Sequence, residues 1–70
     1  MATVEGRVLS KVEAKEFIYE RLLKGYYFDD ACQFGDNKLS REAQWCVDYF
    51  MCICADGWDF FEALRCAFNC

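Results

Sequence analysis

The 70-residue chain contains no proline and no histidine. It also lacks any low-complexity linker, and both absences favour one compact unit spanning residues 1–70 over several joined domains. Without histidine, a cysteine nucleophile would depend on a lysine or a helix N-terminus to become a thiolate, and neither is placed by sequence beside a cysteine. We therefore expect a protein that is not an enzyme and has no cofactor.

A long uncharged apolar run is missing as well. Asp48, Asp56 and Asp59 interrupt the only extended apolar region, which leaves no stretch near the ~18 apolar residues of a membrane span. The first residues contain no basic segment followed by an apolar run, so a secretory signal is not expected. These absences predict a soluble cytoplasmic protein without membrane contact, resident in the host cytoplasm if the chain is phage-encoded.

Positive charge is scarce, with 8 Lys and Arg against 12 Asp and Glu and a net charge of −4. Proteins that bind DNA or RNA directly need a basic surface to neutralise phosphates, so direct nucleic-acid binding is not expected. An acidic surface suits a basic protein partner better.

Six cysteines are present. Most of them lie among apolar residues at helical spacing, where thiols act as small core side chains, and we expect no bound metal. Cys52 and Cys54 would point about 200° apart on a helix and cannot chelate together. Cys66 and Cys70 are four residues apart and can share a face, so a thiol-based metal-binding protein remains an alternative.

The chain repeats itself. Leu9–Ala14 recurs, one residue shorter, as Leu39–Ala43, and Gly25–Ala31 aligns with Gly57–Ala63. Each copy has the pattern of a helix, a glycine turn and a second helix. The prediction is an all-α fold, a bundle of about four helices formed by two hairpins at residues 10–35 and 39–70. Residues 1–9 are expected to form a short extended arm with no evident strand to pair with.

In the first copy, Ser10 and Glu13 form a capping box that starts a helix, and Gly25 ends it. Residues at helical spacing predict one buried face of this helix: Ala14, Phe17, Ile18, Arg21 and Leu22. Val12, Tyr19 and Leu23 are expected to widen that face. A short helix should follow over about residues 28–34, stopped by the turn at Gly35–Asn37.

In the second copy, a helix over residues 40–55 carries no charge from Tyr49 to Ala55. Such a helix should be buried on several sides, which makes it the expected centre of the bundle. Gly57 should end it in a left-handed conformation. Asp59 and Glu62 then form an acidic capping box for a last helix that runs to about Phe68.

Two resemblances follow from these patterns. Gly25–Ala31 and Gly57–Leu64 resemble the Met-Gly-Phe loop and following helix of ubiquitin-associated domains. Lys24 and Asp56 stand where that loop has methionine, and we do not extend ubiquitin binding to this chain. As a small acidic chain without catalytic motifs, the protein is similar in its general format to phage-encoded inhibitors of host defence, including anti-CRISPR proteins. That likeness implies an inhibitor that occupies another protein.

The candidate partner-binding residues are one aromatic and several acids at the two turns and the linker: Tyr27, Asp29, Asp30, Asp36, Asp56, Asp59 and Glu62. Aromatic rings beside charge are typical of interface hot spots. Tyr26 and Trp58 occupy equivalent places in the two copies, which favours a structural role for them. The expected partner is a larger protein or protein–nucleic-acid complex with a basic surface. A small subunit of an assembly, or a self-associating module such as a homodimer, is the other alternative.

Overall fold

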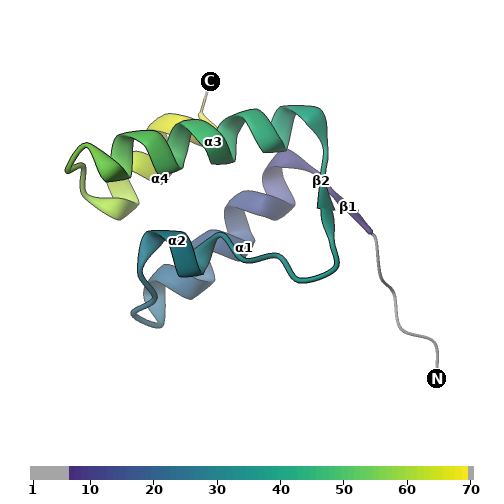
Figure 1. Ribbon diagram of the computed structural model, residues 1–70, viewed down its shortest axis with the longest axis horizontal. Coiled ribbons are helices and arrows are strands. Elements are labelled where there is room, and N and C mark those ends of the chain that lie inside the picture. Colours follow the sequence, from purple (N-terminus) through teal and green to yellow (C-terminus); the bar gives the residue numbers. More distant parts are fainter. Residues whose placement is uncertain (1–6, 70) are drawn as a thin grey trace.

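The computed structural model describes residues 7–69, which form four helices and a two-stranded sheet (Figure 1). The elements follow in the order β1 (Val8–Leu9), α1 (Lys11–Leu23), α2 (Phe28–Ala31), β2 (Lys38–Leu39), α3 (Arg41–Ala55) and α4 (Phe60–Phe68). The predicted small helical bundle is confirmed. Across residues 7–69, no helix combines the length and the apolar composition needed to cross a membrane.

The two strands join the starts of the two sequence repeats. β1 and β2 are parallel, with Leu9 opposite Leu39, and the amide of Ser40 donates to the carbonyl oxygen of Leu9 at 3.0 Å. The expectation that the N-terminal arm has nothing to pair with is therefore wrong for Val8 and Leu9. Their partner is the equivalent segment of the other copy. Residues 1–6 of the predicted arm lie outside the described residues.

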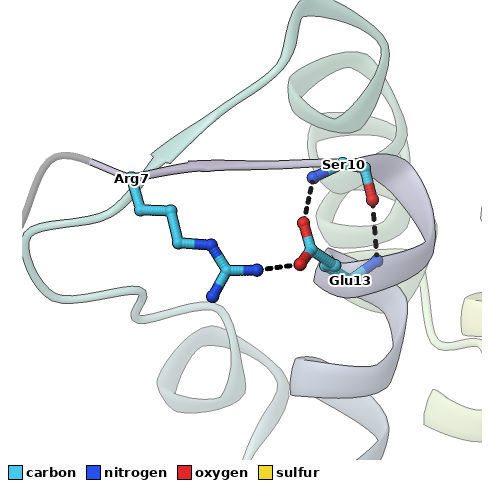
Figure 2. A network of polar contacts seen from close by, with 3 residues as sticks. All are labelled: Arg7, Ser10 and Glu13. Atoms are coloured by element: carbon cyan, nitrogen blue, oxygen red, sulfur yellow. Dashed lines mark hydrogen bonds and ion pairs between the residues drawn. The ribbon is translucent and has the colours of Figure 1, made fainter. Parts of the chain in front are cut away.

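α1 begins at the predicted capping box of Ser10 and Glu13. An ion pair connects this capping box to Arg7, the residue before β1 (Figure 2). The Ser10 hydroxyl accepts from the Glu13 amide at 3.2 Å, and the Ser10 amide donates to Glu13 Oε1 at 3.0 Å. The guanidinium of Arg7 contacts Glu13 Oε2. The Ser10 amide, followed by the Arg7 charge, lowers the pKa of Glu13, so this carboxylate stays ionised while it holds strand and helix together.

α1 and α3 end in the same way, as the repeat predicts. Gly25 and Gly57 adopt left-handed conformations, with φ of 93° and 106°. The amide after each glycine returns to a carbonyl oxygen in the last helical turn, Tyr26 to Arg21 at 3.0 Å and Trp58 to Ile53 at 3.1 Å. This is the Schellman arrangement, in which glycine avoids the strain that a side chain would cause.

α2 is shorter than the predicted helix over residues 28–34. It ends at Ala31 because the next residues contact α1. Arg21 donates to the carbonyl oxygen of Gln33, and the ring of Phe34 packs on Phe17 with centroids 5.2 Å apart. Once those groups are held by α1, the backbone of residues 33 and 34 does not continue the helix.

The core is shared by α1, α3 and α4. Its largest fully buried side chains are Ile18, Cys46, Phe50 and Leu64. α3 contacts α1, α2 and α4, as expected of a central helix, and α1 also contacts the other three helices. The two sequence copies therefore bury their apolar faces against each other.

Several apolar residues expected in the interior lie at the surface. Along α3, Trp45 is 61% exposed, and Tyr49 and Cys52 are also exposed, so this helix is not buried all round. On α1, Val12, Tyr19 and Leu23 do not widen the buried face. The outer faces stay open because no further element of residues 7–69 covers them.

We predict that Phe50→Ala lowers the free energy of unfolding by about 3–5 kcal/mol, because it leaves a cavity at the meeting point of three helices. Urea denaturation followed by circular dichroism measures the change. Trp45→Ala, which removes a large exposed ring from the same helix, should cost about 1 kcal/mol or less. Equal losses in the two variants would contradict the placement of α3.

Candidate interaction surface at the two glycine turns

The glycine turns of the two copies meet through three aromatic rings, Tyr27, Phe28 and Phe60, which we call the turn cluster. Phe60 meets Tyr27 edge to face, with ring centroids 5.1 Å apart and planes at 83°, and meets Phe28 at 5.5 Å and 66°. Tyr27 and Phe28 are 5.0 Å apart. Figure 1 shows α2 and the α3–α4 turn at the same end of the molecule. Edge-to-face packing is a favoured geometry for rings and fixes the turns relative to each other.

Five exposed acids lie close to the turn cluster in the sequence, at the helix ends next to the two turns: Asp29, Asp30, Asp56, Asp59 and Glu62. The first two occupy the first turn of α2, Asp56 is the C-cap of α3, and the last two begin α4. We call this set the acidic rim. One aromatic contact thus joins the two turns beside which five of the six predicted acidic site residues lie in the sequence.

Two members of the acidic rim also have local structural roles. Asp59 Oδ2 accepts from the amides of Phe61 and Glu62, both at 3.1 Å, and so caps α4. Asp29 Oδ1 accepts from the Asp30 amide at 2.9 Å. Carboxylates near helix N-termini are stabilised by the helix dipole, so these acids cost the fold little.

Asp36 lies apart from the other predicted site residues. It belongs to the connection between α2 and β2, and its neighbour Asn37 lines a hollow together with Arg7 and Glu13 at the β1 end of α1. Nothing in this geometry links Asp36 to the turn cluster. Its predicted role in partner binding stays a prediction.

The aromatic residues of the two turns differ in how exposed they are. Tyr27 is 59% exposed although its ring packs against Phe60. Tyr26 and Trp58 follow the two equivalent glycines and are about half exposed, at 47% and 43%. Tyr27 is therefore held by the other copy and still accessible, which suits a contact residue better than a purely structural one.

Phe28 and Phe60 were not identified from the sequence as residues that join the two turns. A signal for this role exists. Both residues follow their glycine by three positions, so they are equivalent in the repeat. Equivalent apolar residues at two turns are candidates for a contact between the copies, and the structure places these two in contact.

Two cysteines lie beneath the acidic rim. Burial, followed by the nearby Cys54 and Asp29, raises the pKa of Cys32 to about 12. Burial and then Asp59 raise the pKa of Cys54 to about 11. Both thiols are free and protonated near neutral pH, which makes them poor nucleophiles and poor metal ligands.

Within residues 7–69, no group of three or more His, Cys, Asp or Glu side chains is arranged to hold a metal ion. Cys70 lies outside the described residues. The alternative metal site at Cys66 and Cys70 therefore stays a prediction.

Comparison of the chain with protein-family models, with curated proteins and with solved structures found no match.

Thiol reactivity tests the electrostatics beneath the acidic rim. At pH 8, about one part in 10³ of Cys54 and less of Cys32 is thiolate, so iodoacetamide should modify the exposed Cys52 well before either. Peptide mapping by mass spectrometry measures each rate. As the pH approaches 11, Cys54 should begin to react, and unfolding in urea should equalise the three. Equal rates in the native protein at pH 8 would contradict the burial of these thiols.

Proposed function

We propose that the chain is a non-catalytic cytoplasmic protein that binds a basic surface on a larger protein or protein–nucleic-acid complex through the turn cluster and the acidic rim. One observation carries the proposal. An accessible tyrosine, Tyr27, is held in place by Phe60 of the other hairpin, and exposed acids lie close to both residues in the sequence.

The turn cluster supports binding because it is organised before a partner arrives. Tyr27 and Phe60 come from different hairpins, so their contact restricts both turns. A ring that is already restrained loses little conformational entropy on binding, and tyrosine is enriched at interface hot spots. The acidic rim adds the electrostatic attraction that speeds encounter with a basic surface and orients the complex.

We further propose that binding inhibits the partner by occupancy. A basic surface on a protein is often the place where it holds nucleic acid, and an acidic protein seated there would block it. The likeness in format to phage-encoded inhibitors of host defence, including anti-CRISPR proteins, fits this mode.

The proposal predicts that Asp29→Lys/Asp30→Lys slows association roughly tenfold at low salt, because two attractive charges become repulsive. A pull-down from the cytoplasm of the source cell or its host identifies the partner, and surface plasmon resonance then measures the rates. Association of the unaltered protein should slow as ionic strength rises through roughly 0.1–0.5 M.

A matched control makes the same change in net charge at two residues outside the acidic rim. Glu20→Lys/Asp48→Lys replaces one exposed carboxylate on α1 and one on α3. It should associate with the partner at close to the original rate, and circular dichroism should show both double variants folded. If the two double variants bind alike and salt has no effect, the acidic rim is not the binding surface.

A further inference from the structure

A groove runs along α1 and α4, and none of the residues that line it belongs to the turn cluster. It consists of two hollows of about 670 and 460 Å³ that share Lys15 and Tyr19 as lining residues. The first brings the start of α1 against Phe68, and the second brings Leu23 against Phe61. The helices are therefore antiparallel along the groove. From Val12 to Leu23 it follows about three helical turns, or roughly 16 Å.

Exposed apolar side chains follow the whole length of this groove. Val12 is 64% exposed, Leu23 62% and Tyr19 47%, and all three lie along one stripe of α1. Phe61 of α4 meets Tyr19 edge to face at 5.8 Å, which joins the two walls between the hollows. Contiguous exposed apolar surface on a small protein marks an interaction site, and its burial would be favourable.

The charge of the groove is opposite to that of the chain as a whole. Among the described residues that line it, three are cations and a single one, Glu16, is acidic. Lys11 contacts Glu42 at 3.8 Å, which leaves Lys15 at the centre and Arg65 on α4 as the charges best placed for an incoming group. A basic segment would be repelled here, whereas carboxylates beside an apolar stripe would be attracted.

We propose that the α1–α4 groove binds an amphipathic helix whose apolar stripe is flanked by acidic residues. A helix of three turns matches the length of the groove, with its apolar residues against Val12, Tyr19 and Leu23. Its carboxylates lie beside Lys15 and Arg65. The occupant is the opposite in charge to the partner of the acidic rim, so the protein has two binding surfaces for two different chemistries.

The probe is a synthetic 14-residue helical peptide with leucines at i, i+3, i+4 and i+7 spacing and glutamates on both flanks. Its twin carries lysine at every glutamate position. We expect the glutamate peptide to shift the amide resonances of Val12, Tyr19 and Phe61, and to bind at least about tenfold more tightly than the lysine twin. Fluorescence anisotropy of labelled peptides measures both affinities.

Two variants localise the binding. Val12→Asp should abolish it, whereas Val8→Asp, the same change at a β1 residue of similar exposure (57%), should leave it intact. Lys15→Glu should shift the preference from the glutamate peptide toward the lysine twin. The proposal is overturned if neither peptide binds at millimolar concentration, if both bind equally, if Val12→Asp has no effect, or if the shifts map to Trp45 and Tyr49 instead. Since Asp29 and Asp30 are unchanged in these variants, failure here leaves the proposed function untouched.

Discussion

Each hairpin of this protein can bury its apolar face only against the other one. Phe50 on α3 is fully buried together with Ile18 of α1 and Leu64 of α4, so the core belongs to both copies. A supersecondary unit that cannot bury its own face must stack on a neighbour, and in a chain of 70 residues the neighbour is its own repeat. The register of the two copies follows from their starts, where Leu9 lies opposite Leu39.

The same stacking produces both candidate binding surfaces. Because the copies lie against each other, the two glycine turns meet, and the rings of Tyr27 and Phe60 come into contact with each other. α1 and α4, which belong to different copies, also form a groove lined by Lys15 and Arg65. Aromatic residues make up 19% of the sequence, and exposed ones contribute apolar area to both surfaces, Tyr27 at the turns and Tyr19 and Phe61 in the groove.

The sequence predicted the features that depend on local signals. The capping residues Ser10 and Asp59 and the helix-ending Gly25 and Gly57 act through nearby backbone groups, and the structure confirms them. Features that depend on distant residues were missed, because local spacing does not contain them: the pairing of β1 with β2, the early end of α2 at the contacts with Arg21 and Phe17, and the open outer faces of α1 and α3. The candidate site divides in the same way. Its residues follow from charge and aromatic content at the turns, whereas their assembly depends on the contact between Phe28 and Phe60.

The contact between the turns is the claim on which the proposed binding surface depends. A ¹³C-edited aromatic NOESY spectrum of the labelled protein tests it directly. Cross-peaks between the rings of Tyr27 and Phe60 are expected, since their centroids are 5.1 Å apart. The stacked pair Trp45 and Tyr49, which lies within α3 and does not depend on the packing of the hairpins, provides the internal reference at 6.0 Å. A spectrum that shows the reference cross-peaks but none between Tyr27 and Phe60 would contradict the account.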